Sequence, residues 1–435
     1  MDARRFFTHS LRDERIVRIL AAALDAVDPD ATVARYLSSN SLPAFGRVFA
    51  LGLGKAAIPM TRALSRFTTL AEALVITKHA SPLEIQPAAL IESGHPVPDS
   101  RSLAAGKAAL EFVAKLREDD LLVCLISGGG SALMTAPTVP LEDMQTLTSA
   151  LLACGARIDE INTLRRHLDR VKGGGIAKAT QARTLSLILS DVVGNPLEAI
   201  ASGPTAPDQT TKDDALAVIE KYFSNDNKIE IPSTILHSLS SNPETPKPIN
   251  PIFSRVENII VGDNALAAKA ALKQAKHEGF STASLGSNWQ GEARKVGVGL
   301  AKKLRVTKIS QKFPFCLVAG GETTVTLRLR SGQAIQGEGT GGRNQELALA
   351  ATLDLAGLEN ALLITLATDG EDGPTDAAGA VVNGETFQRA DELGLTVADY
   401  LFRNDSYHFF EKLGDLLKIG PTGTNVNDLI FLVGM

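Results

Sequence analysis

The feature of this sequence that most constrains its fold is a series of short apolar runs without polar alternation, each separated from the next by an amphipathic segment. Such runs are typical of strands that are buried on both faces, as in a parallel sheet covered by helices on both sides. In the first half of the chain, these apolar runs predict strands. Helices are expected before and between the strands, over 16–27, 55–67 and 99–117. The predicted strands cover 47–51, 74–77, 89–92, 121–126 and 185–189.

The length of 435 residues exceeds what one hydrophobic core usually organises, so we expect two domains. A Pro-, Ser- and Asn-rich segment over 238–251 is the best linker, and it predicts domains over 1–245 and 246–435. Beyond the linker a helix is predicted over 265–277, and alternation from Val325 to Leu329 indicates an antiparallel hairpin in a mixed sheet. An alternative is that the last strand returns to the first domain. The further predicted strands cover 259–261, 315–318, 324–329, 362–366 and 429–433.

Composition excludes several classes of protein. The net charge of −5 and the 5% aromatic content do not suit a nucleic-acid or membrane binder. No run approaches the ~20 apolar residues that span a bilayer, and the charged N-terminus does not resemble a signal peptide. We therefore expect a cytoplasmic protein without membrane or nucleic-acid partners. Its three cysteines, at 124, 154 and 316, are expected to be reduced thiols.

The first motif that could bind a ligand or take part in a reaction is GLGKAA, directly after the strand over 47–51. Gly52 and Gly54 allow the backbone to turn tightly and to approach a phosphate, and Lys55 adds a positive charge within the loop. The motif also fits the dinucleotide pattern G-x-G-x-x-A, so an NAD(P) dehydrogenase is a rival interpretation. That interpretation lacks the acidic residue expected at the end of the second strand, where Lys78 and His79 stand instead. A glycine turn with a solvated lysine is the remaining alternative.

A second glycine run, Ser127-Gly128-Gly129-Gly130-Ser131, follows the strand over 121–126. In an open parallel sheet, ligands bind at the carboxyl ends of the strands. Successive glycines at such a position can present several backbone N–H groups to a phosphate. We therefore expect these five residues, together with Gly52 and Gly54, to bind a nucleotide phosphate, although a plain flexible turn would also explain the run.

Charged side chains follow other strands of the first half. Asp191 comes directly after the strand over 185–189, where a carboxylate suits Mg²⁺ coordination or general-base work on a hydroxyl. A helix cap or a turn former is the alternative for this residue. Arg165 and Arg166 stand just before a further glycine run, and either could bind a substrate carboxylate or phosphate. A solvated helix face is the alternative for the two arginines.

In the second half, three motifs carry candidate residues. Glu322 follows the strand over 315–318 and is a candidate substrate contact. Arg343 opens a predicted helix, where a cation is electrostatically unfavourable by itself, so it is a functional candidate. Asp369 lies in an acidic loop after the strand over 362–366 and is a weaker candidate for Mg²⁺, since such acids often only shape turns.

Together these motifs resemble the glycerate 2-kinases, the family whose C-terminal half is called the MOFRL domain. Several motifs of this length in the family's order are far more specific than any one of them. They extend from about residue 50 to the C-terminus. The matching segments are GLGKAA, SGHPVPD, SGGGSAL, NTLRRHL with KGGG, SDVVGNPLEAIASGPT, GGETTV, GGRNQELALA, TDGEDGPTDAAGA and TGTNVNDL.

The resemblance implies ATP-dependent, Mg²⁺-assisted phosphorylation of D-glycerate to 2-phosphoglycerate. It also implies a Rossmann-like N-terminal domain and a smaller, mixed-sheet α/β C-terminal domain, with the active site in the cleft between them. On the matching motifs, Lys55 and Arg343 would be the catalytic cations and Asp191 their acidic partner. The expected partners are a small-molecule substrate and a nucleotide, and the protein would be a monomer or a homodimer.

Two departures from the family pattern are visible. Asn195 stands where the family usually has Asp, which weakens a metal role at that position, and the stretch 329–339 is longer than usual. Some family members have been named hydroxypyruvate reductases, so an NAD(P)H-linked reductase remains the rival enzyme. A nucleotide- or sugar-phosphate-binding sensor is the non-enzymatic alternative, although several polar loops at strand ends argue against it.

Overall fold

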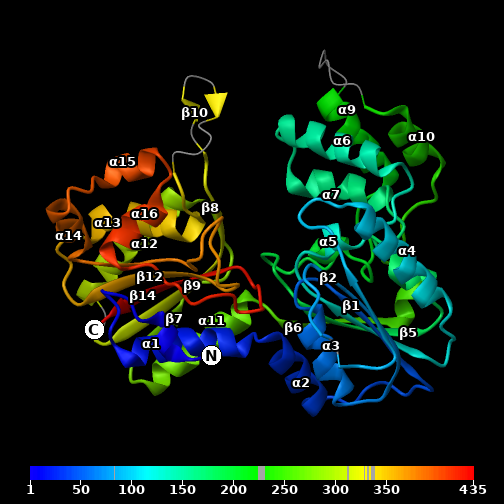
Figure 1. Ribbon diagram of the computed structural model, residues 1–435, viewed down its shortest axis with the longest axis horizontal. Coiled ribbons are helices and arrows are strands. Elements are labelled where there is room, and N and C mark those ends of the chain that lie inside the picture. Colours follow the sequence, from blue (N-terminus) through cyan, green and yellow to red (C-terminus); the bar gives the residue numbers. More distant parts are fainter. Residues whose placement is uncertain (83, 224–230, 311–312, 328, 331–332, 335–338) are drawn as a thin grey trace. The chain divides into compact units, whose positions relative to one another are not determined.

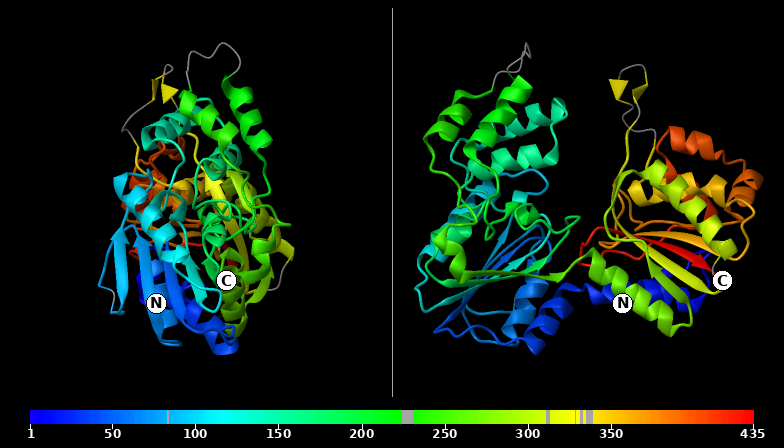
Figure 2. Two further views of the ribbon diagram at one scale, coloured as in Figure 1. Left: turned by 90° about the vertical axis from the view of Figure 1, so that its right-hand side faces the viewer. Right: turned by 180° about the vertical axis from the view of Figure 1, so that it is seen from behind.

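The computed structural model describes residues 1–82, 84–223, 231–310, 313–327, 329–330, 333–334 and 339–435. The chain forms two compact units, shown in Figures 1 and 2. The first unit is Pro29–Val261, and the second unit joins Met1–Asp28 to Gly262–Met435. Within the described residues, no helix is long and apolar enough to cross a membrane.

The first unit contains a six-stranded sheet in the order β3-β2-β1-β4-β5-β6. The four strand pairs from β3 to β5 are parallel, which confirms the parallel sheet predicted from the buried apolar runs. The strands are β1 (Val48–Leu53), β2 (Leu70–Thr77), β3 (Ala88–Glu92), β4 (Leu121–Ile126), β5 (Arg183–Leu189) and β6 (Val256–Gly262).

Helices cover both faces of this sheet. Alternate side chains of a strand point to opposite faces, so the apolar side chains of one strand pack against helices on both sides. Leu74 and Ile76 of β2 join the core that includes helix α4 (Ser100–Ala114), whereas Val75 joins a separate cluster with helix α3 (Ala57–Ser65). Every residue of β1 and β4 is buried. Asp99 caps α4, since its carboxylate accepts from the N–H groups of the first turn.

Four further helices of the first unit pack on one another and form their own apolar core (Figure 1). Leu147, Leu164, Ile219 and Leu239, one from each helix, are almost fully buried in it. These helices are α6 (Leu141–Ala153), α7 (Ile158–His167), α9 (Lys212–Phe223) and α10 (Ser233–Ser241), and the unit also contains α2 (Pro29–Ser39), α5 (Gly130–Leu133) and α8 (Gly175–Ala179).

The second unit contains a mixed sheet in the order β13-β12-β14-β9-β7, with β8 paired to β9. Strand β14 is antiparallel to β12 and β9, whereas β7 and β8 are parallel to β9, so the predicted mixed sheet is confirmed. The strands are β7 (Ser281–Ser284), β8 (Trp289–Glu292), β9 (Phe315–Thr324), β12 (Ala361–Ala367), β13 (Val381–Asn383) and β14 (Asp428–Gly434).

The predicted hairpin beyond β9 is short. It consists of β10 (Leu329–Arg330) paired antiparallel with β11 (Gln333–Ala334), so only one residue of the run predicted over 324–329 is in β10. The rest of the long stretch 329–339 lies largely outside the described residues.

Helices cover both faces of the second sheet (Figure 1). On one face, α1 (Glu14–Ala26) packs on α11 (Asn264–His277), which contacts β7 and β9. The other face carries a core that includes Phe315, Leu347, Phe409 and Phe410. The helices on that side are α12 (Ala293–Ser310), α13 (Arg343–Leu355), α14 (Thr386–Glu392), α15 (Val397–Phe402) and α16 (Ser406–Leu413).

The predicted division of the chain at residue 245 differs from the two observed units at two places, the boundary itself and the N-terminus. Strand β6, which was expected to open the second domain, neighbours β5 in the first sheet. The N-terminal 28 residues join the second unit, where Thr8 and Ser10 donate hydrogen bonds to the buried carboxylate of Asp415. The last strand stays between β12 and β9, so the alternative that it returns to the first domain is wrong.

The predicted linker over 238–251 is a packed part of the first unit. Its first residues, Ser238–Ser241, complete helix α10. Glu244 then accepts a hydrogen bond from His167, and the Thr245 hydroxyl donates to Asp208 at 3.0 Å. The segment rich in proline and polar residues is therefore a surface segment that hydrogen bonds hold in place. Its composition does not distinguish it from a linker.

Candidate active site

The loops that follow β1 and β4 are joined by hydrogen bonds. The Lys55 N–H donates to the Gly128 carbonyl at 3.0 Å, and the Ala56 N–H donates to Ser127 Oγ at 3.0 Å. Gly54 has φ +119°, and a Cβ at this position would lie 2.3 Å from Ser127 Oγ. Glycine is therefore required at 54 by the contact between the two loops.

Gly52 has a comparable packing reason, because a Cβ there would lie 2.7 Å from Thr61 Oγ1 on helix α3. Gly52 and Gly54 are both buried, whereas the Lys55 side chain is exposed. Within the part of the chain that the structure describes, the Lys55 ammonium has no hydrogen bond or ion pair. The first loop thus presents an unpaired cation, and the predicted nucleotide contact of its two glycines stays a prediction.

Three side chains from three strand ends converge on Gly128 and Gly129. A Cβ on Gly128 would lie 2.2 Å from Asp191 Oδ2, and a Cβ on Gly129 would lie 3.1 Å from His95 Cδ2 and 3.5 Å from Lys55 Cγ. Lys55 follows β1, His95 follows β3 and Asp191 follows β5, while the glycines follow β4. All of these loops leave the carboxyl ends of parallel strands, where ligands bind in such sheets.

The pKa values of Asp191 and His95, two of these three side chains, are shifted in opposite directions. Burial raises the pKa of the Asp191 carboxyl, and the nearby Lys55 charge opposes this only in part. Burial, together with the charges of Lys55, Lys78 and His79, lowers the pKa of His95 to about 4. At neutral pH the imidazole is therefore neutral, and Asp191 is a stronger base than an exposed aspartate.

A cavity of about 770 Å³ in the first unit opens beside these residues. Its polar wall includes His95, Gly129, Ser131, Arg165 and Asp191. Gly129 is the N-cap of α5 and has φ +86°, and no side chain among the described residues caps that helix. The first N–H groups of a helix have no acceptor within the helix, so they are available to an anion.

Arg165 and Arg166, two candidate substrate contacts, have different surroundings. Arg165 is partly buried in the cavity wall, and burial lowers the pKa of its guanidinium. Within the described residues it has no hydrogen bond or ion pair. Arg166 is buried and donates to Asp208 at 2.8 Å and to the Thr210 hydroxyl at 3.2 Å. The structure therefore brings Arg165, and not Arg166, to the cavity.

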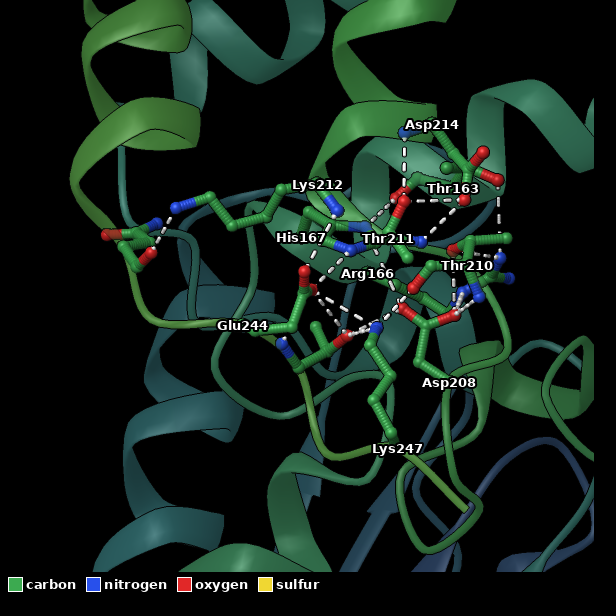
Figure 3. A network of polar contacts seen from close by, with 12 residues as sticks. Thr163, Arg166, His167, Asp208, Thr210, Thr211, Lys212, Asp214, Glu244 and Lys247 are labelled. Atoms are coloured by element: carbon green, nitrogen blue, oxygen red, sulfur yellow. Dashed lines mark hydrogen bonds and ion pairs between the residues drawn. The ribbon is translucent and has the colours of Figure 1, made fainter. Parts of the chain in front are cut away.

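Figure 3 shows the polar network that holds the Arg166 side chain. Its Asp208 partner also accepts from Thr210, and the adjacent His167 is hydrogen-bonded to Glu244 at 3.0 Å. Lys247 is paired with Glu244 at 3.1 Å. Arg166 is thus one member of a polar network in which its charge is neutralised.

An ion pair that we did not predict as part of the site also lines the cavity. Lys172 is buried, and its ammonium donates to Asp169 at 2.8 Å and to the Met134 carbonyl at 3.0 Å. Asp169 in turn accepts from the Thr135 hydroxyl and the Ala136 N–H. In the sequence, Lys172 appeared only as a lysine before a glycine run. Asp169, which neutralises it, lies in no recognisable motif of its own.

In the second unit, Arg343 is held by two acids. Its guanidinium donates to Asp428 through Nε at 2.5 Å and through Nη2 at 3.0 Å, and Nη2 lies 3.6 Å from Glu322 Oε1. Asp372 accepts from the N–H groups of Asn344 at 3.1 Å and Gln345 at 2.9 Å, so it caps the helix that Arg343 opens. These acids offset the unfavourable cation at the start of α13.

Asp372 and Asp428 are close enough to affect each other. Burial and the Asp428 charge raise the pKa of Asp372 to about 7, although the two helix N–H groups and Arg343 oppose the shift. Sequence reasoning did not select either residue. Asp372 is one of four acids in the motif TDGEDGPTD, and Asp428 is the single acid of the motif TGTNVNDL, so their only signal was their place in these motifs.

Two further predicted positions have local roles. Asp369 is partly buried, and its carboxylate accepts from the Glu371 N–H at 3.2 Å. Asn195 has φ +56°, a left-handed conformation that asparagine tolerates. Within the described residues, no group of three or more His, Cys, Asp and Glu side chains could hold a metal ion. The three cysteines are free thiols, as predicted.

The comparisons with known proteins first define a class. Residues 15–239 match a family model described as a domain of unknown function, DUF4147, and residues 315–428 match the MOFRL family. The chain is therefore a two-unit α/β protein in which a DUF4147 domain precedes a MOFRL domain.

Individual relatives then identify the family. The chain is 37% identical to the glycerate 2-kinase of Pyrococcus horikoshii over 433 residues, which cover 96% of each chain. The crystal structure of glycerate kinase from Thermotoga maritima matches with a TM-score of 0.87 at 40% identity, over 96% of this chain and 98% of that one. A putative hydroxypyruvate reductase of Agrobacterium vitis is 37% identical over 95% of this chain and 92% of that protein. The chain belongs to the glycerate 2-kinase family, which confirms the resemblance seen in the sequence.

Proposed function

We propose that this chain transfers the γ-phosphoryl group of ATP to the 2-hydroxyl of D-glycerate and releases 2-phosphoglycerate and ADP. The observation that carries the proposal is the identity of 37% over 96% of each chain with a relative named glycerate 2-kinase. The convergence of Lys55, His95 and Asp191 on the Gly128–Gly129 step supports it, since a kinase needs a cation, a base and a phosphate-binding backbone close together.

Charge neutralisation is the main demand of phosphoryl transfer. In the proposal, Lys55 and Arg343 stabilise the oxygens of the transferring phosphoryl group, and the Ser127–Ser131 loop with Gly52 and Gly54 contacts the nucleotide phosphates. Lys55 suits this role because its ammonium has no ion-pair partner within the described residues. Arg343 suits it because Asp428 fixes the orientation of its guanidinium.

Asp191 is the proposed proton acceptor. The oxygen of the glycerate 2-hydroxyl forms a bond to the γ-phosphorus while the bond from that phosphorus to ADP breaks, and the hydroxyl proton passes to the Asp191 carboxylate. A raised pKa makes this carboxylate a better base. For the glycerate carboxylate we propose Arg165, which the cavity exposes, rather than Arg166, while a Glu322 contact with the substrate remains a prediction.

The residues fit a magnesium ion that is carried by the nucleotide. Mg²⁺ is usually held by one or two carboxylates together with phosphate oxygens rather than by a cage of protein ligands. Asp191 lies beside Gly128 and supplies one such carboxylate. It would hold the ion if it does not act as the proton acceptor. Asp369 is the second, weaker candidate for a magnesium ligand. When bound, Mg²⁺ neutralises charge on the phosphate oxygens.

The rival function is an NAD(P)H-linked hydroxypyruvate reductase. It is favoured by the G-x-G-x-x-A spacing and by the relative that is named a putative hydroxypyruvate reductase. It is opposed by Lys78 and His79, which follow β2 at the place where a dinucleotide site has an acid for the ribose hydroxyl.

Product analysis tests the proposal directly. After incubation of the protein with D-glycerate, ATP and Mg²⁺, we expect 2-phosphoglycerate by ³¹P NMR or mass spectrometry. Formation of 3-phosphoglycerate, or of no phosphorylated acid, would contradict the proposal. A parallel incubation with hydroxypyruvate and NADPH decides the rival, because a reductase would oxidise the cofactor.

A further inference from the structure

The cavity of the first unit has an apolar wall that the proposed phosphate and glycerate contacts do not use. We define this wall as Val97, Leu141, Met144 and Leu152, all of which line the cavity. Three of them lie on helix α6 at spacings of three and eight residues, so they share one face of the helix. Val97 comes from the loop that also carries His95.

The size of the cavity indicates a ligand larger than the acceptor. Its volume is about 770 Å³. Cavities that enclose drug-sized ligands have volumes of about 300–1,000 Å³, and a nucleoside triphosphate belongs to that size class. A three-carbon acid such as glycerate fills only a small part of such a space, so a second, larger ligand is needed to occupy the apolar wall.

The exposure of the wall supports the same conclusion. Val97 and Leu152 are 61% and 62% exposed, whereas Met144 between them is only 9% exposed. Gln145 donates a hydrogen bond from Nε2 to the Pro98 carbonyl at 2.9 Å, which holds the Val97 loop against α6. Two exposed apolar side chains that line one cavity are typical of a surface that a ligand covers.

Polar groups beside the wall match a heteroaromatic base. Gln145 uses one of its two Nε2 hydrogens for the Pro98 carbonyl, so its Oε1 acceptor and its second amide hydrogen remain for a ligand at the cavity wall. The Thr148 and Ser149 hydroxyls line the same cavity and can donate or accept. An apolar face with one acceptor and two hydroxyls suits a purine ring that carries an exocyclic amine.

We infer that the apolar wall binds the adenine ring of the nucleotide whose phosphates lie at Gly129 and Ser131. This inference rests on the proposed function and adds the part of the site that recognises the base. Burial of the Leu152 side chain against the ring would contribute to nucleotide affinity and not to glycerate affinity.

The test compares Leu152→Gln with Ile158→Gln in the full-length protein. Ile158 is 64% exposed in the same unit but does not line the cavity, so it is a matched control. By isothermal titration calorimetry we expect Leu152→Gln to raise the Kd of ADP about tenfold, the loss expected when an apolar contact of this size is removed. Ile158→Gln should leave that Kd unchanged. In steady-state kinetics the KM for ATP should rise and the KM for D-glycerate should stay constant.

The inference would be overturned by an unchanged Kd of ADP in Leu152→Gln, by an equal rise in the control, or by a rise in the KM for D-glycerate alone. If Leu152→Gln does not fold, as judged by circular dichroism, Val97→Thr gives the same comparison from the other side of the cavity. Failure of the proposed function looks different: the wild-type protein would then bind ADP but form no 2-phosphoglycerate.

Discussion

Arg165 and Arg166 are neighbours in the chain, but their charges have different surroundings. We expect Arg165→Gln to raise the KM for D-glycerate about tenfold or more, because a charged hydrogen bond to the substrate is lost. Stability to urea should hardly change, since this guanidinium has no ion pair within the described residues. Arg166→Gln should lower the free energy of unfolding by about 3–5 kcal/mol, because the buried carboxylate of Asp208 loses its positively charged partner. Equal effects of the two variants on KM would contradict this assignment.

Lys55 and Arg343 are predicted to act in the transition state. Removal of an electrostatic stabiliser costs about 100-fold or more in kcat, so we expect losses of that size for Lys55→Ala and for Arg343→Ala. Lys107→Ala is a suitable control, because Lys107 is an exposed lysine of α4 that pairs with Glu111 at 3.9 Å. Near-normal turnover in either of the first two variants would remove that residue from the proposed mechanism.

Asp372 makes the stability of the protein depend on pH. Its pKa is raised from the usual 3.8 to about 7 in the folded state, so the folded protein binds more protons than the unfolded chain between these values. The stability linked to this group is present below about pH 4 and is lost as the pH rises through 7. We expect the free energy of unfolding of the wild type to fall between pH 5 and pH 8, and that of Asp372→Asn to fall less. Urea unfolding at both pH values measures this, and parallel profiles would show that Asp372 does not titrate in this range.

At the scale of elements, the loops after β1 and β4 differ in what their glycines contact. Gly54→Ala should destabilise the fold, because its Cβ would lie 2.4 Å from the Ser127 carbonyl oxygen and its φ is +119°. Gly128→Ala should instead leave thermal stability nearly unchanged and lower kcat, because its Cβ would displace the flexible Asp191 side chain. Thermal unfolding and steady-state kinetics of the two variants separate these effects. A large loss of stability in Gly128→Ala would show that the Asp191 side chain cannot move.

Most elements were predictable, because a continuous short apolar run indicates a buried strand and an amphipathic segment indicates a helix. The run over 121–126 became β4 without a change of bounds. Strand β6 was predicted as a strand but assigned to the wrong sheet, since a buried apolar run carries no information about its neighbour. Arg343 at the start of α13 looked anomalous in sequence, and only the fold brought Asp372 and Asp428 to it.

At the scale of the whole molecule, the N-terminal segment is part of the second unit. Phe6, Ile16 and Leu20 are fully buried, and Thr8 and Ser10 bind Asp415. Removal of residues 1–28 should therefore lower the thermal stability of the second unit while the first unit stays intact. Hydrogen exchange measures this: amides of β9 and β14 should lose protection, and those of β1 and β4 should keep it. Equal loss in both units would contradict the division of the chain.

The sequence by itself determined the class of fold, the family and the strand ends that carry Lys55, Asp191 and the glycine run. These properties follow from local periodicity and from motif order, which need no knowledge of contacts. Only the tertiary structure decided that Arg165 faces the cavity, that Arg166 is neutralised and that the first 28 residues complete the second unit. Each of these depends on contacts between residues far apart in the chain. Asp208 meets Arg166, and Asp415 meets Thr8 and Ser10, only when the elements pack.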